Sequence, residues 1–158
     1  MKSNVECFDY CVLIIANELY HRFPICGDLE PYELIKNDNL IARCGVGKKS
    51  QNQSGAEISN QERLVTIMGQ TLFWLQENGF LDYNSEPEHR DYSVLSVYSC
   101  VRLTAKGLLV LKSTPDSLKG AVTLGEHIGK TLRESADNML RESTTRAVMM
   151  VVGALSSL

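Results

Sequence analysis

The sequence has no long apolar run and no excess of positive charge, and each absence excludes a class of protein. The longest apolar stretch, residues 147–155, has 9 residues and includes Gly153, whereas a helix that crosses a bilayer needs about 20. Lys and Arg number 16 against 19 Asp and Glu, a net charge of −3. Because phosphate backbones and anionic lipids attract cations, we expect neither a membrane protein nor a general nucleic-acid coat.

The chain also lacks the features of a secreted protein. Its first twenty residues carry Glu6, Asp9 and Glu18, so the uninterrupted apolar core of a secretory signal is missing. The five cysteines are odd in number, scattered and too sparse for a disulfide framework. We therefore expect a cytoplasmic protein.

Periodic apolar positions predict a long first helix. From Val5 to Phe23, apolar residues recur at steps of three and four, which is typical of an amphipathic helix. Ser3 and Glu6 have the spacing of a capping box, and Pro24 ends the helix. Further apolar residues outside the main stripe indicate burial on more than one side.

A short helix, a loop and a long helix follow. Pro31 suits the first turn of a short helix, and the polar composition of 45–58 predicts a mobile insertion. Helical spacing returns over 57–78, with Ser59 as candidate cap. Gly79 suits the left-handed residue that ends a helix.

A β-hairpin and a helix come next. We expect strands at 80–83 and 94–103, the second with strict alternation of its two faces. A polar turn, 84–91, separates them. Thr104 then caps a helix that Pro115 ends.

Two motifs frame this hairpin. The long helix closes with LQENGFL at 75–81, and the second strand leads into VRLTAKGL at 101–108. Over residues 4–111 the chain resembles the winged helix-turn-helix superfamily. In that superfamily the third helix closes with a leucine, an acidic residue, a glycine and an apolar residue, and the wing returns into a Leu-Thr-x-Lys-Gly helix start. The resemblance implies a third helix that usually enters the DNA major groove.

The predicted fold class is α+β and mostly helical. A winged-helix domain with a small antiparallel β-hairpin wing spans 1–111, and a C-terminal helical extension spans 112–158. An apolar stripe over 118–155 contains the small residues Gly125 and Gly129, which allow close helix approach. The stripe either closes onto the first helix or pairs with a second copy, so a homodimer is one alternative.

The surface that would read DNA in such a domain is acidic. Residues 57–106 carry 4 basic and 7 acidic side chains, a local charge of 4 − 7 = −3. Bound phosphates need nearby cations, whereas an acidic face suits a basic protein partner. We therefore expect a non-enzymatic protein-binding module, by analogy an immunity or antitoxin-like inhibitor. The residues expected to contact the partner are Arg63, Thr66, Gln70, Phe73 and Glu77 on the long helix, with Glu86, Glu88 and Asp91 on the wing.

Two other functions stay open. A DNA-binding transcription regulator would be dimerised by the tail and would read its site with Arg63, Thr66 and Gln70. An enzyme would need a nucleophile beside a base. Because the three histidines lie in different predicted elements, far from any nucleophile motif, we expect no catalytic residue.

A basic loop is the first candidate contact for an acidic ligand. The segment CGVGKKS at 44–50 lacks the glycine and hydroxyl spacing of a phosphate-binding loop. Its Lys48 and Lys49, together with Arg43, form the most compact cationic cluster of the sequence.

The cysteines carry no strong ligand signal. Cys7 and Cys11 lie four residues apart and, with Cys26, invite comparison with a metal site. Because no second ligand pair follows, we expect no metal and no cofactor. Cys7, Cys11, Cys44 and Cys100 are expected to pack as small apolar side chains.

Overall fold

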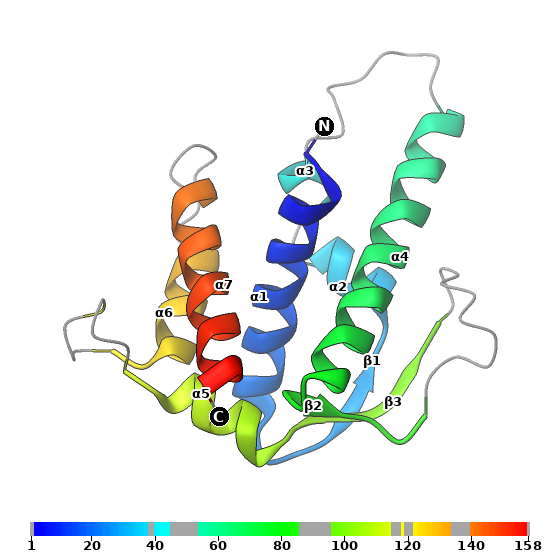
Figure 1. Cartoon of the computed structure of the whole chain (residues 1–158). Coiled ribbons are helices and arrows are strands. Elements are labelled where there is room, and N and C mark those ends of the chain that lie inside the picture. The colour runs from blue at the N-terminus through cyan, green and yellow to red at the C-terminus, as the bar shows by residue number, and fades with distance from the viewer. Residues whose placement is uncertain are drawn as a thin grey trace.

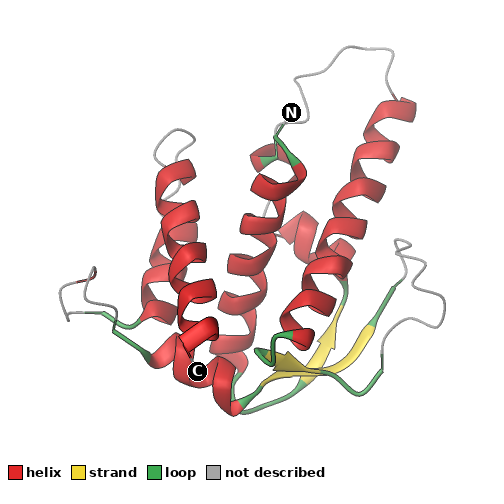
Figure 2. Cartoon of the chain, viewed as in Figure 1, coloured by secondary structure: helices red, strands yellow, loops and turns green. Residues whose placement is uncertain are grey.

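Helices dominate the structure, and a small antiparallel sheet lies at one end of them (Figures 1 and 2). The computed structural model describes residues 2–37, 40–44, 54–85, 96–114, 118, 122–133 and 140–157. In chain order the elements are α1 (Asn4–Arg22), β1 (Gly27–Leu29), α2 (Pro31–Asn37), α3 (Leu40–Arg43), α4 (Ser54–Glu77), β2 (Leu81–Asp82), β3 (Tyr98–Leu103), α5 (Ala105–Lys112), α6 (Leu124–Arg133) and α7 (Leu140–Ser157). The predicted α+β, mostly helical class is confirmed.

Helix α1 is the central element. The backbone N–H of Glu6 donates to Ser3 Oγ, and the N–H of Ser3 donates to Glu6 Oε2 at 2.9 Å, so the predicted capping box is confirmed. The helix ends at Arg22, before Pro24. It packs against α4 on one side and against α6 and α7 on the other (Figure 1). Its burial on several sides follows from the apolar residues outside the main stripe.

Three elements near the middle of the chain differ from expectation. The short helix after Pro31 is confirmed as α2, but β1 and α3 were not predicted because each has at most four residues. Helix α4 begins at Ser54, so Ser59 lies inside the helix and does not cap it. The end of this helix is as predicted, since Gly79 has a φ of +71°. The expected mobile insertion at 45–58 is wrong for residues 54–58, which are helical and belong to α4, and residues 45–53 lie outside the described residues.

The sheet has the strand order β1-β3-β2. Strands β2 and β3 pair antiparallel, as the hairpin predicts. The expected strict alternation along β3 is wrong: β1 residues Gly27 and Leu29 face Val101 and Tyr98, so β3 carries an extra residue. Cys100 takes up this bulge with a φ of +53°. Side chains on the two sides of the bulge therefore exchange faces.

Cys26 and Cys100 form a disulfide between the start of β1 and β3. Cys26 is exposed and Cys100 is half-buried, so the prediction that Cys100 is a packing residue is wrong. The two residues are 74 positions apart, and only the pairing of β1 with β3 brings them together. The packing role is confirmed for Cys7, Cys11 and Cys44, which are free and buried.

Helix α5 begins at the predicted cap. The N–H of Gly107 donates to Thr104 Oγ1 at 3.0 Å, and the Thr104 hydroxyl also contacts the carbonyl of Phe80. A Cβ on Gly107 would overlap the Phe80 carbonyl oxygen. The absence of a side chain at Gly107 therefore lets the helix approach the end of α4 closely.

The tail closes back onto α1. Gly125 packs against the ring of Tyr20 and Gly129 against Asn17, so the small residues of the stripe allow close helix contact within one chain. Val148 and Val151 in α7 are also buried. A homodimer stays a prediction. None of the helices that the structure describes is long and apolar enough to cross a bilayer.

Candidate functional site

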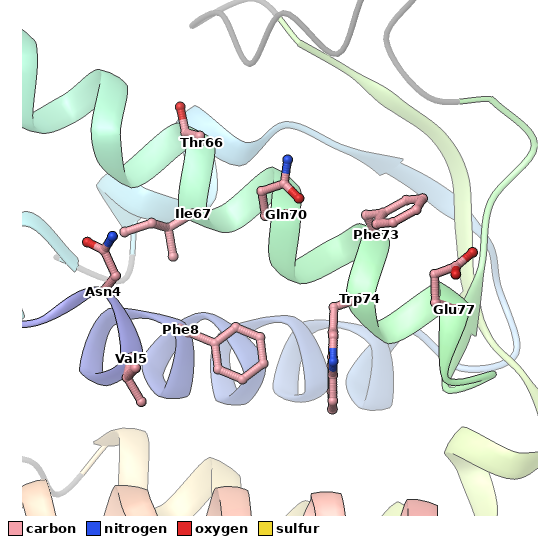
Figure 3. Close-up of a pocket in the computed structure, with 9 residues that line it drawn as sticks. All are labelled: Asn4, Val5, Phe8, Thr66, Ile67, Gln70, Phe73, Trp74 and Glu77. Atoms are coloured by element: carbon pink, nitrogen blue, oxygen red, sulfur yellow. The ribbon is translucent and has the colours of Figure 1, made fainter.

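An apolar groove runs between α1 and α4 (Figure 3). Its volume is about 870 Å³, within the size range of pockets that bind ligands. Both helices contribute side chains to it. The lining residues, which define the α1/α4 groove, are Asn4, Val5 and Phe8 from α1 and Thr66, Ile67, Gln70, Phe73, Trp74 and Glu77 from α4.

Aromatic side chains form much of this lining. Phe8 and Trp74 make an edge-to-face contact across the two helices, with ring centroids 5.3 Å apart, an arrangement that contributes about 0.5–1.5 kcal/mol beyond area burial. Phe8, Phe73 and Trp74 are each only half-buried. The groove thus keeps aromatic surface available to a ligand.

Helix α4 separates its core face from its groove face by helical periodicity. Its apolar stripe is buried in the core; these residues are Leu64, Met68, Leu72 and Leu75. On the opposite face, Thr66, Gln70, Phe73 and Glu77 line the groove, as Figure 3 shows. These four are among the residues expected from the sequence to contact a partner, and the structure brings them together.

Arg63 lies at one end of this face and has a structural role. Its Nε and Nη2 donate to Asn4 Oδ1 at 3.0 and 2.7 Å, and Nη2 also donates to the backbone carbonyl of Lys2 at 3.0 Å. The guanidinium thereby ties α4 to the start of α1. Arg63 does not line the groove but holds Asn4, which does.

One acidic side chain lines the groove, and two others lie one helical turn from residues that line it. Glu77 lines it and is exposed, and Glu62 is exposed one helical turn before Thr66. Asp9 follows Val5 by one turn of α1 and so shares a face with it. Burial raises the pKa of Asp9, and the nearby Glu6 raises it further.

The cations nearest this acidic margin are engaged within the chain. Arg63 donates to Asn4 as described. The ammonium of Lys2 donates to the Tyr10 hydroxyl at 2.9 Å and lies 4.3 Å from the centre of the Tyr10 ring. Among the described residues that line the groove, Glu77 is the one with an ionisable side chain.

The remaining predicted site residues do not join the groove. Arg43 donates from Nη2 to the carbonyl of Leu132 at 3.1 Å, so it caps the C-terminal end of α6. The other members of the basic loop and the acidic residues of the wing tip lie outside the described residues: Lys48, Lys49, Glu86, Glu88 and Asp91.

Sequence reasoning missed the contribution of α1. Phe8 belongs to the apolar stripe of that helix, and the structure places it half-buried at the groove. Val5 is 70% exposed. The sequence carries no signal for this, because the place of Val5 at the groove depends on where α4 packs.

Within the described part of the chain, no group of three or more His, Cys, Asp or Glu residues is placed to hold a metal ion.

Comparisons with known proteins add no relative. No protein-family model, no curated protein and no solved structure matches the chain. The winged-helix resemblance therefore depends on two sequence motifs and on the order of the elements around them.

Proposed function

We propose that the chain is a non-enzymatic protein-binding module of winged-helix type that binds a basic segment of a partner protein in the α1/α4 groove. The observation that carries this proposal is the pairing of aromatic lining with an acidic margin. Buried aromatic anchors supply most of the energy of a typical interface. Complementary charge at the rim guides and orients the partner.

The shape of the groove suits an amphipathic helix. Its α4 wall extends from Thr66 to Glu77, which is about 16 Å at 1.5 Å per residue, or about three turns of a partner helix. A helix laid in a groove presents anchors every three or four residues. Apolar anchors would contact Phe8 and Trp74, while Lys or Arg on the flanks would face the acidic margin.

The order of elements supports the winged-helix part of the proposal. Helix α4 is followed by β2, β3 and then the Thr104-capped α5, in the order that the two motifs require. By analogy, the chain would act like an immunity or antitoxin-like inhibitor that covers the cationic surface of its partner. A homodimer through the tail is left as a separate proposal.

A cytoplasmic location is part of the proposal, and one observation speaks against it. Disulfides persist in oxidising compartments and are rare in a reducing cytosol, and Cys26 is bonded to Cys100. Rapid alkylation of free thiols in native cells, followed by mass spectrometry of the Cys26 peptide, decides this point. A free Cys26 thiol supports the cytoplasm, and a bonded one contradicts it.

DNA binding is the second candidate, because Thr66 and Gln70 are exposed on α4. Arg63, the one cation among the three predicted base-reading residues, is held by Asn4 and the Lys2 carbonyl. Releasing it would cost contacts that tie α4 to α1. A protein partner is therefore the better supported ligand.

The test compares two designed helical peptides of equal apolar content, one with Lys and one with Glu on its polar face. We expect the cationic peptide alone to bind, and Glu77→Lys to weaken it about tenfold, or about 1.4 kcal/mol. Glu30→Lys makes the same change at an exposed residue that does not line the groove and should leave affinity unchanged. Equal binding of both peptides, or tight binding of duplex DNA at physiological salt, would contradict the proposal.

A further inference from the structure

The two ends of the α1/α4 groove differ in chemistry. Asn4 lies at the end where Thr66 is, and Glu77 lies at the other end (Figure 3). The α4 wall between Thr66 and Glu77 is about 16 Å long at 1.5 Å per residue. A helix laid along this wall therefore has one of its ends near Asn4 and the other near Glu77.

Asn4 presents hydrogen-bond donors at its end of the groove. Arg63 Nε and Nη2 donate to Asn4 Oδ1 at 3.0 and 2.7 Å. Because a guanidinium has donors and no acceptor, it fixes the orientation of the amide, and the amide oxygen must face Arg63. Within the described residues, Asn4 Nδ2 has no acceptor, and the side chain is exposed. Its two N–H donors are therefore open to a ligand.

Glu77 presents an acceptor at the opposite end. Its side chain is exposed, and among the residues that the structure describes none of the three ion pairs includes it. Lys106 lies against Gly79, past the end of α4, and forms none of these pairs either. Glu77 lies in the last turn of α4, which has no basic residue. Because the C-terminal end of a helix carries partial negative charge, an acid there destabilises its own helix. A donor or cation from a ligand would relieve this repulsion.

The charges around the two ends also differ. In the first turn of α1 and the facing turn of α4, two cations offset two acids; these residues are Lys2, Arg63, Glu6 and Glu62. The Asn4 end therefore has no excess of negative charge, whereas the Glu77 end has one. Both α1 and α4 run from the Asn4 end toward the Glu77 end (Figures 1 and 3). The groove thus has the positive start of α1 at one end and the negative end of α4 at the other.

A partner helix has complementary groups at its own two ends. Its first turn has unpaired N–H donors and partial positive charge, and its last turn has unpaired carbonyls and partial negative charge. We propose that the partner helix binds in one direction, antiparallel to α4, with its N-terminal turn at Glu77 and its C-terminal carbonyls at Asn4. This inference rests on the proposed function, because it gives the direction of the same partner helix.

Each end of the partner helix is then capped by this chain. The Glu77 carboxylate accepts hydrogen bonds from N–H groups of the partner's first turn, as an N-cap side chain does. It also pairs with a Lys or Arg placed in that turn. Asn4 Nδ2 donates to carbonyls of the partner's last turn. The partner is therefore an amphipathic helix whose cations lie in its first turn.

The experiment uses the cationic helical peptide with a nitroxide label on either its N-terminus or its C-terminus. A nitroxide quenches tryptophan fluorescence at short range, and Trp74 lies toward the Glu77 end of the groove (Figure 3). We expect the N-terminal label to quench Trp74 several-fold more than the C-terminal label. In a Trp74→Phe, Val5→Trp variant the fluorophore lies at the Asn4 end, and the order of quenching should reverse. Val5 is 70% exposed, so a larger side chain fits there.

Asn4→Asp separates the direction of the helix from the charge of the groove. The new carboxylate keeps an oxygen for Arg63 but replaces the Nδ2 donors with an acceptor, which repels the carbonyls of the partner's last turn. We expect calorimetry to show several-fold weaker binding of the cationic peptide, although the variant gains a negative charge. Asn84→Asp makes the same change at an exposed residue that does not line the groove, and it should leave affinity unchanged.

The outcomes distinguish this inference from the proposed function. Stronger quenching of Trp74 by the C-terminal label, equal quenching by both labels, or tighter binding to Asn4→Asp overturns the proposed direction and leaves the proposed function standing. No binding of the unlabelled cationic peptide to the unmodified chain overturns the proposed function and the direction with it. Circular dichroism of each variant confirms that its fold is kept.

Discussion

Phe8 of α1 and Trp74 of α4 meet edge to face, with ring planes at 88° and centroids 5.3 Å apart. The contact joins the two helices at the α1/α4 groove, and Trp74 is the only tryptophan of the chain. Its fluorescence therefore reports on one known place. Because Trp74 lines the groove, a ligand that binds there is expected to change the tryptophan fluorescence of the protein.

Binding of the cationic helical peptide should shift the Trp74 emission to shorter wavelength. The indole is half-buried in the free protein, and a partner helix would remove its remaining contact with water. A fluorescence titration measures the shift and the affinity together. Trp74→Phe should abolish the signal and keep binding when measured by calorimetry. A peptide that binds by calorimetry without shifting the emission occupies another surface.

Gly107→Ala should lower the free energy of unfolding by at least about 1–3 kcal/mol, which is the usual cost of overpacking a core. The added Cβ would meet the backbone carbonyl of Phe80, which belongs to a buried chain segment and has little freedom to move. Gly153→Ala is the matched control in α7, with nothing within 4 Å of the added Cβ. It should stabilise its helix by about 0.5–1 kcal/mol. Urea unfolding of both variants separates the two effects.

Reduction of the Cys26–Cys100 disulfide should lower the free energy of unfolding by about 2–4 kcal/mol. The bond closes a separation of 74 residues and so restricts the unfolded chain, in the entropic account of disulfide stabilisation. Thermal unfolding with and without dithiothreitol measures the loss. The Cys26→Ser, Cys100→Ser variant should show the lowered stability in both conditions. A reductant effect that persists in that variant would place the stabilisation elsewhere.

The long helices were predictable because their apolar periodicity is local. Helix α1 and the core face of α4 follow from residues three and four apart, and the residues opposite that core face line the groove. The α1 side of the groove was not predictable. Whether Phe8 is core or surface depends on where α4 packs, and α4 begins 46 residues later in the chain, at Ser54.

The sheet was predictable only in part. Strands β2 and β3 are neighbours in the chain, and the turn between them gives a local signal, whereas β1 has three residues and shows no period of two. The bulge at Cys100 and its bond to Cys26 both depend on the pairing of β1 with β3. Long-range pairing of this kind leaves no pattern in a single sequence.

Asp9→Asn should stabilise the protein at neutral pH and have no effect at pH 3. Burial, with help from Glu6, raises the pKa of Asp9 above its ordinary value of 3.8. At pH values between 3.8 and the raised pKa of the folded protein, the native state therefore binds more protons than the unfolded state. The free energy of unfolding therefore falls as pH rises through this window, and the full cost of the charged carboxylate is present at pH 7. Because Asp9 is partly exposed, we expect a gain of about 0.5 kcal/mol. Asp82→Asn removes the exposed ion pair with Arg102 and should lower stability at neutral pH. Urea unfolding of both variants at the two pH values measures these changes. A lower free energy of unfolding for Asp9→Asn at neutral pH would show that the Asp9 carboxylate is stabilising and would contradict the prediction.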